Sequence, residues 1–190
     1  IESMHRLTAL LFFAVLGIIG VPAAYAADPT TIVEQPIEFP HDRHAGDMGI
    51  NCMYCHTYAR RSIVSGIPPL AKCMGCHQNI ESVKDKPRIK KLFEYWEKKQ
   101  AIPWKKVHDL PDFVRFNHER HIQRFYFQQG KPVQEVCGYC HGDVKTMKVA
   151  QQVKPLTMGW CRSCHMEDHQ VAKGSKETTN GPSDCWVCHK

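Results

Sequence analysis

The stretch Cys52-Met53-Tyr54-Cys55-His56 decides how this sequence is interpreted, because its pattern C-x-x-C-H returns four more times. The other copies occupy residues 73–77, 137–141, 161–165 and 185–189, and together the five use all ten cysteines of the 190-residue chain. A random order of the same residues would contain roughly 0.03 such strings. The repeat is therefore a functional signal and not an accident of composition.

C-x-x-C-H is the attachment signal for c-type haem. Its two thiols form thioethers with the haem, and the adjacent histidine becomes the proximal ligand of the iron. We therefore predict five covalently bound haem c groups. The predicted attachment residues are Cys52, Cys55, Cys73, Cys76, Cys137, Cys140, Cys161, Cys164, Cys185 and Cys188, and the predicted proximal ligands are His56, His77, His141, His165 and His189.

Other uses of paired cysteines fit the pattern less well. Five structural disulfides would not require a histidine after every pair. A zinc ribbon uses two pairs per metal, which leaves one pair over and five histidines unexplained. A thioredoxin-like redox motif occurs once in a domain and not five times.

The composition agrees with a protein whose interior is filled largely by haem groups. Hydrophobic residues make up 43% and aromatic residues only 9% of the chain, which is little material for an ordinary apolar core. We predict a mostly α-helical fold with irregular loops, built around the five porphyrins. Their propionates would more than cancel the formal charge of +6, so the basic sequence gives no reason to expect a nucleic-acid partner.

The N-terminal part contains a long apolar segment. Residues 7–27 are 21 consecutive uncharged positions, which would span about 31 Å as a helix and cross a bilayer. The segment is equally compatible with a signal peptide cleaved after Ala24-Tyr25-Ala26. Of the two, we favour a retained single-pass anchor over residues 1–27, with the haem-binding part on the periplasmic face of the membrane.

A weak internal repeat precedes two groups of haem motifs. Residues 39–44 (F-P-H-D-R-H) come before the first two motifs, and residues 116–121 (F-N-H-E-R-H) come before the last three. Histidines at i and i+3 on a helical turn can serve two different haems. We therefore divide the chain after the anchor into a dihaem module with a basic linker at 28–110 and a trihaem module at 111–190.

Five six-coordinate irons need five ligands beyond the proximal histidines. The two strings supply four of them, and one further histidine completes the set, with His169 as the spare. Methionine is the competing ligand type and would raise the potential of its haem. The predicted sixth ligands are His41, His44, His108, His118 and His121, with Met147 as the leading methionine candidate ahead of Met158 and Met48.

The region between the modules is basic. Residues 84–106 hold nine lysines and arginines against three acidic residues, and residues 88–100 have the spacing of a helix with Ile89, Leu92, Phe93 and Trp96 on one face. Its basic side is either simply solvated or a docking surface for an acidic partner or lipid headgroups. The remaining predictions are helical turns at every haem motif, strands at residues 32–34 and 113–116, and a polar surface loop at 172–183.

Several strings resemble known multihaem proteins. Residues 39–47 with the first motif, and Ile67-Pro68-Pro69 leading to the second, are similar to the cytochrome c3/c7-type multihaem family. Residues 102–118 (I-P-W-K-K-V-H-D-L-P-D-F-V-R-F-N-H) and 155–160 (P-L-T-M-G-W) resemble the pentahaem cytochrome c subunits of alternative complex III. Haem number, order and the apolar N-terminal segment agree with that family.

The resemblance implies a subunit of a membrane-bound quinol oxidoreductase. In that family the pentahaem subunit relays electrons beside an iron–sulfur subunit and a monohaem cytochrome c, while polytopic membrane subunits oxidise quinol. The resemblance also implies that His108 is a ligand and keeps Met147 and Met158 as candidates.

The sequence itself contains no catalytic constellation that we recognise, and all five motifs end in histidine, so we expect an electron relay and no catalytic centre of its own. Two other functions remain open. A polymerising extracellular or stand-alone periplasmic cytochrome would have a cleaved leader. A small periplasmic reductase would have a five-coordinate haem.

Overall fold

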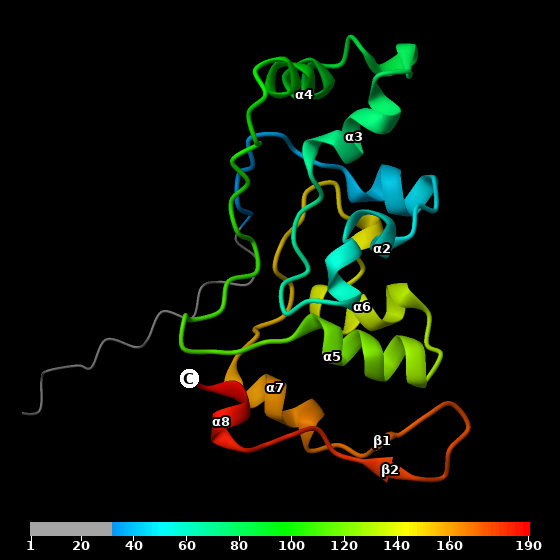
Figure 1. Cartoon of the computed structure of the whole chain (residues 1–190), viewed down its shortest axis with the longest axis vertical. Coiled ribbons are helices and arrows are strands. Elements are labelled where there is room, and N and C mark those ends of the chain that lie inside the picture. The colour runs from blue at the N-terminus through cyan, green and yellow to red at the C-terminus, as the bar shows by residue number, and fades with distance from the viewer. Residues whose placement is uncertain (1–31) are drawn as a thin grey trace, which may run out of the picture.

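A computed structural model describes residues 32–190, which form short helices joined by long loops (Figure 1). Within that range no helix has the length and apolar character needed to cross a bilayer. The predicted anchor at residues 1–27 lies outside the described residues. The helical segments are, in order, η2 (Asp42–Asp47), α2 (Cys52–Cys55), η3 (Thr57–Arg60), α3 (Leu70–His77), η4 (Glu81–Val83), α4 (Pro87–Glu97), α5 (His118–Ile122), η5 (Gln123–Gln128), α6 (Val133–His141), η6 (Val144–Thr146), α7 (Met158–His165) and α8 (Cys185–Cys188).

The helices follow one another along the long axis of the molecule. In Figure 1, α4 and α3 occupy one end, α2 follows, α6 and α5 lie in the middle, and α7 and α8 lie at the other end. A single antiparallel hairpin, β1 (His169–Gln170) with β2 (Thr178–Thr179), extends beside α7 and α8. The haem motifs are therefore spread along the molecule and not gathered at one place.

Every haem motif carries a helical turn, as the sequence predicted. The attachment cysteines lie on α2, α3, α6, α7 and α8. Two of these helices begin with a side-chain cap: the Asn51 side chain accepts the backbone N–H of Met53, and the Thr157 hydroxyl accepts that of Trp160. One turn of helix places the two thiols of each motif on neighbouring positions, with the histidine at or just beyond the end.

The two repeated strings also fold alike. His41 immediately precedes η2, which is a π-helical turn, and His118 begins α5, which continues directly into the π-helical η5. The Asn117 side chain caps α5 by accepting the backbone N–H of Arg120. The sequence repeat is therefore a structural repeat as well.

Only nine hydrophobic residues are buried in the described part of the chain, and most lie in two small clusters. The first contains Ile37, Met74, Leu92 and Ile102, so it joins α3 to α4. The second contains Ala59, Ile122 and Val136, and therefore joins residues from both sides of the predicted boundary at 110. The boundary itself stays a prediction. The thin core agrees with the expectation from composition.

The basic helix forms where it was predicted, with one correction. It covers Pro87–Glu97, with Pro87 at its first position. Leu92 is buried, and Ile89 and Phe93 pack on the first cluster, but Trp96 is 38% exposed. Its predicted place in the packed face is wrong because the contacts of α4 with the cluster end at Tyr95.

The predicted strands are mostly wrong. Residues 32–34 have no regular structure, and 113–116 contribute a single β-bridge from Val114 to His189. β-Branched residues there had suggested strands, but no second extended segment runs alongside for more than one residue. The hairpin instead forms around the polar tail, where Arg124 donates hydrogen bonds to the carbonyl oxygens of His169 and Val171.

Candidate haem sites

Three predicted distal histidines face three predicted proximal ones. Two imidazoles bound to opposite sides of one metal ion, each with a bond of about 2.0–2.1 Å, have ring centroids roughly 6 Å apart. The observed centroid distances are 6.1 Å for His44 and His77, 6.4 Å for His118 and His141, and 6.0 Å for His121 and His165. These spacings fit an iron between the rings of each pair.

The hydrogen bonds of the histidines leave the ligating nitrogen free. A metal-binding histidine normally donates its other ring N–H to a carbonyl or carboxylate, which fixes the ring. Here Nδ1 contacts a backbone carbonyl oxygen in five rings: His44 with Pro40 at 2.9 Å, His56 with Gly66 at 2.9 Å, His118 with Ile63 at 2.9 Å, His121 with Asn117 at 2.8 Å and His165 with Pro182 at 2.6 Å. In all five rings Nε2 is the nitrogen left to bind iron.

Burial lowers the pKa of six of the predicted site histidines and so favours the neutral form, which is the form that binds a metal: His41, His77, His108, His118, His121 and His141. Desolvation, followed by the neighbouring His108 and His118, lowers the pKa of His141 to about 3. Desolvation, followed by His56 and His44, lowers the pKa of His41 to about 4. Both imidazoles are therefore ready to bind iron at neutral pH without first losing a proton.

The repeated strings also place an aromatic ring against each histidine pair. Phe39 stacks on His44 with centroids 4.4 Å apart and meets His41 edge-on at 4.8 Å. Phe116 repeats both contacts with the second string. Sequence reasoning passed over these two phenylalanines, although the repeat that begins with them could have identified them.

None of the ten cysteines forms a disulfide, so all ten can serve haem attachment. They are intermediate or exposed and none is buried, so a porphyrin edge can reach them. Cys52 and Cys137 interact across α2 and α6, and the hydrogen bond with Cys137 lowers the pKa of Cys52 to about 6. The attachment points of the first and third motifs are therefore close neighbours.

Two remaining site histidines have a buried Nδ1 without a protein partner. They are His41 and His77. A buried polar atom of this kind usually has an unseen partner such as water, ion or ligand. Both residues are among the predicted haem ligands.

His108 occupies a different position from the other candidates. Its Nε2 is 3.2 Å from Nδ1 of His141, and the two ring centroids are only 4.3 Å apart. That spacing is shorter than in the three facing pairs, and the contact involves the nitrogen of His141 that is not needed for iron. The structure thus places His108 where it can orient His141, and its role as a ligand stays a prediction.

The fifth motif has a different surrounding. His189 stacks on Phe113 at 5.8 Å with an interplanar angle of 23°, and its backbone pairs with Val114. Phe113 lies in the string that resembled the pentahaem family. Its position beside the last motif could be seen only in the tertiary structure.

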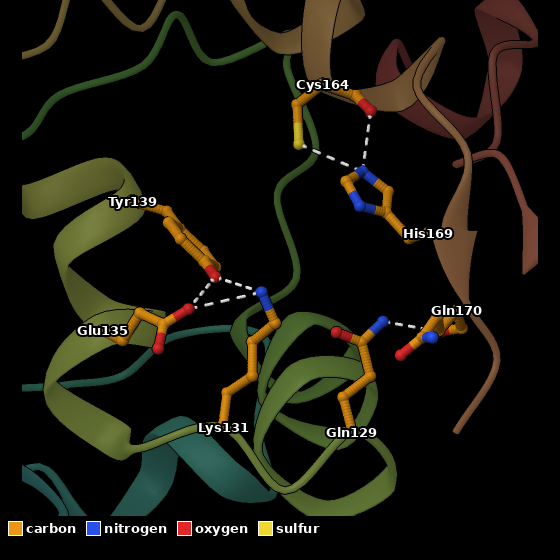
Figure 2. A network of polar contacts seen from close by, with 7 residues as sticks. All are labelled: Gln129, Lys131, Glu135, Tyr139, Cys164, His169 and Gln170. Carbon is orange, nitrogen blue, oxygen red and sulfur yellow. Dashed lines mark hydrogen bonds and ion pairs between the residues drawn. The ribbon is translucent and has the colours of Figure 1, made fainter. Parts of the chain in front are cut away.

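The structure also places the remaining candidates for iron ligands, which are His169, Met147 and Met158. His169 lies beside Cys164, with its Nε2 3.0 Å from the Cys164 carbonyl oxygen and 3.5 Å from the thiol (Figure 2). Met147 is buried at the end of η6 and Met158 is 59% exposed at the start of α7. The ring nitrogen of His169 that would bind iron is engaged, in contrast to those of the five rings above.

A polar network beside His169 joins α6 to the loop that precedes it. Lys131, Glu135 and Tyr139 contact one another, with Lys131 Nζ 3.2 Å from Glu135 Oε1 and 2.5 Å from the Tyr139 hydroxyl (Figure 2). The Gln129 side chain donates to the Gln170 carbonyl oxygen at 2.6 Å. These contacts hold the third motif and the hairpin against η5.

Comparison with known proteins agrees with this geometry. Residues 21–108 match the model of the Class III cytochrome C family. Over these residues the chain is similar to that family, and its C-x-x-C-H motifs and facing histidine pairs agree with the similarity. It is also similar to the "Menaquinone reductase, multiheme cytochrome c subunit" of Nitratidesulfovibrio vulgaris, with 28% identity over 172 residues that cover 83% of this chain and 77% of the relative.

Proposed function

We propose that this chain binds five haem c groups and relays electrons as the cytochrome subunit of a membrane-bound quinone oxidoreductase. The observation that carries the proposal is the pairing of His44, His118 and His121 with the histidines of three motifs at 6.0–6.4 Å. Bound haem c supplies reversible one-electron chemistry. The chain holds each haem by two thioethers and two axial ligands, and its burial and hydrogen bonds set the potential.

Two similarities support the quinone-linked complex. The relative from Nitratidesulfovibrio vulgaris is named as a subunit of a menaquinone reductase. The strings at 102–118 and 155–160 resemble the pentahaem subunits of alternative complex III, which oxidises quinol. Both share quinone as the substrate class and differ in the direction of electron flow. We take the partners to be an iron–sulfur subunit, a monohaem cytochrome c and polytopic membrane subunits that bind the quinone.

The location follows from the same proposal. Haem is attached to c-type cytochromes outside the cytoplasm, and residues 7–27 are apolar enough to hold the chain at the membrane. The haem-binding residues would then lie on the periplasmic face. The chain contributes no quinone chemistry of its own, and its histidines and cysteines serve only to bind and orient haem.

The test is purification from detergent-solubilised membranes, followed by intact mass and identification of copurifying proteins. We expect the mass of the polypeptide plus five haems, together with polytopic and iron–sulfur subunits. A chain that runs alone or forms filaments would instead show a stand-alone or polymerising cytochrome. Fewer than five haems would contradict the assignment of the C-x-x-C-H strings.

The direction of electron flow between quinone and the haems can be measured on the same preparation. Adding a menaquinol analogue to the oxidised complex reduces the haems if electrons flow from quinol, whereas dithionite-reduced haems are oxidised by the quinone if they flow towards it. The matched control is a complex whose chain carries Cys137→Ala and Cys140→Ala, in which the third haem is missing. No redox response to either compound in the intact complex would refute the quinone-linked function.

A further inference from the structure

We propose that the five haem sites form a single file in the order second, first, third, fourth, fifth, so that electrons enter and leave at the second and fifth. The inference rests on the proposed binding of five haems, but not on the quinone partner. Each step along the file moves one electron, oxidising one haem iron and reducing the next. The external donor and acceptor are the redox partners at the two ends.

The second and first sites are joined by the first repeated string. His44 faces His77 of the second motif, and His41 lies three residues earlier, directly before the same π-helical turn η2. A second contact joins α3 to the first motif. The ammonium of Lys72 on α3 lies 4.4 Å from the ring centroid of Tyr54, and Tyr54 stands between the two cysteines of the first motif. The second and first haem attachment points are therefore adjacent.

The first and third sites meet across α2 and α6. These two helices, which carry the attachment cysteines of the first and third motifs, are in direct contact. Around them, Met53 of the first motif packs on the second hydrophobic cluster, to which Val136 contributes from α6. This contact joins residues more than eighty positions apart, and it explains why the sequence order of the motifs is not their order in space.

The third and fourth sites are joined by α5. His118 faces His141 of the third motif and His121, one turn later, faces His165 of the fourth. Because both histidines lie on one short helix, the two irons must lie close together. The string at 116–121 therefore joins the third and fourth sites, just as the string at 39–44 joins the first and second sites.

The fourth and fifth sites are joined by the segment before α8. His165 donates from Nδ1 to the Pro182 carbonyl oxygen at 2.6 Å, and Gly181 donates its backbone N–H to the His165 carbonyl oxygen at 2.9 Å. Three residues after Pro182 the chain reaches Cys185 of the fifth motif. Figure 1 shows α3, α2, α6 and α7 in this order along the long axis, with α8 beside α7.

The two ends of the file differ in chemistry. The second site packs against α4 through Met74 and Leu92, and α4 presents exposed lysines such as Lys91 to solvent. The fifth site presents Trp186, which is 82% exposed between its two cysteines. A basic end and an apolar end fit two different redox partners.

The experiment uses the purified five-haem chain with a ruthenium photoreductant on an engineered thiol, Lys91→Cys, beside the second site. Haem reduction is followed by absorbance at a dilution that prevents exchange between molecules. In the Cys137→Ala/Cys140→Ala variant we expect only about two of the four remaining haems to be reduced rapidly. In the matched Cys185→Ala/Cys188→Ala variant we expect all four. Equal reduction in both variants would overturn the order.

A second measurement does not depend on electron transfer between the haems. A nitroxide label at the same Lys91→Cys position gives its dipolar distances to the ferric haems of the intact chain. The proposed file predicts five increasing distances, and removal of the fifth haem eliminates the longest. Loss of a short distance instead would refute the order. Neither result depends on quinone partners, so failure of the order and failure of the proposed complex are separate outcomes.

Discussion

Phe116 lies nearly parallel to His121, with ring centroids 4.6 Å apart and an interplanar angle of 21°. The same relation holds for Phe39 and His44 in the first string, at 4.4 Å and 26°. In both strings the histidine also donates from Nδ1 to the carbonyl oxygen four residues earlier. Stacking and hydrogen bonding together leave each imidazole little rotational freedom, so its plane about the iron is set by the protein.

Replacing Phe116 with leucine should therefore release the His121 ring. The aromatic contact is worth about 0.5–1.5 kcal/mol beyond buried area. We expect one haem to change its midpoint potential and its low-spin electron paramagnetic resonance signal, because the ring plane about that iron changes. Phe127→Leu is the control, since Phe127 is 50% exposed in the adjoining η5. Identical spectra for the two variants would show that the stacking does not position the ligand.

Removing His44 should open one coordination position at the second haem. His44→Ala leaves His77 without the ring that faces it at 6.1 Å, so we expect one haem in five to become high-spin and to bind carbon monoxide. Optical and magnetic circular dichroism spectra report the spin state. His169→Ala is the comparison, because the Nε2 of His169 is already engaged with Cys164. A high-spin haem in the His169 variant would show that His169 is a ligand after all.

A methyl group at Gly181 should displace the fourth proximal ligand. A Cβ there would lie 2.7 Å from Cγ and 3.0 Å from Cα of His165, and the latter is main chain that cannot turn aside. We expect Gly181→Ala to perturb the His165 haem and lower the melting temperature. At Gly159, near the start of the helix α7 that carries His165, an added Cβ meets nothing within 4 Å, so Gly159→Ala is the matched variant. Equal melting curves and spectra would contradict the steric argument.

The junction of α3 and α4 should depend on one methionine. Met74 is 1% exposed at the centre of the first cluster, so Met74→Ala is expected to lower the free energy of unfolding by about 2–5 kcal/mol. Met166, which is 56% exposed, provides the control, and its alanine variant should stay within about 0.5 kcal/mol of the parent. Thermal unfolding followed by far-ultraviolet circular dichroism measures both. A small loss at Met74 would indicate that bound haem, and not side-chain packing, holds α3 in place.

The local pattern of the sequence was sufficient to predict the haem motifs and the helical turns beneath them. Thioether attachment needs two thiols and a histidine at fixed spacing, and one turn of helix is the local structure that provides it. The strings at 39–44 and 116–121 likewise indicated histidines for two haems each, and three of those four face a motif histidine in the structure. The basic helix was predicted because its apolar spacing and its leading proline are local features too.

Features that depend on distant residues were missed or predicted wrongly. Residues 32–34 and 113–116 have strand-like composition, but a strand needs a partner, and only Val114 finds one in His189. Trp96 has the right spacing for the packed face of α4, yet it is 38% exposed and does not pack on the first cluster. The contact of His108 with Nδ1 of His141 could not be predicted, because it depends on a loop that meets the end of α6, and the ligand role of His108 stays a prediction.

The sequence by itself determined the cofactor class and its attachment residues, because covalent haem binding is encoded within five consecutive positions. Only the tertiary structure decided which histidines face each other and in which order the sites lie. That order depends on contacts such as that of α2 with α6, where Met53 packs on the cluster that contains Val136, and these join segments far apart in the chain. Motif spacing carries no information on such contacts, because long loops between short helices allow many spatial orders and packing selects one.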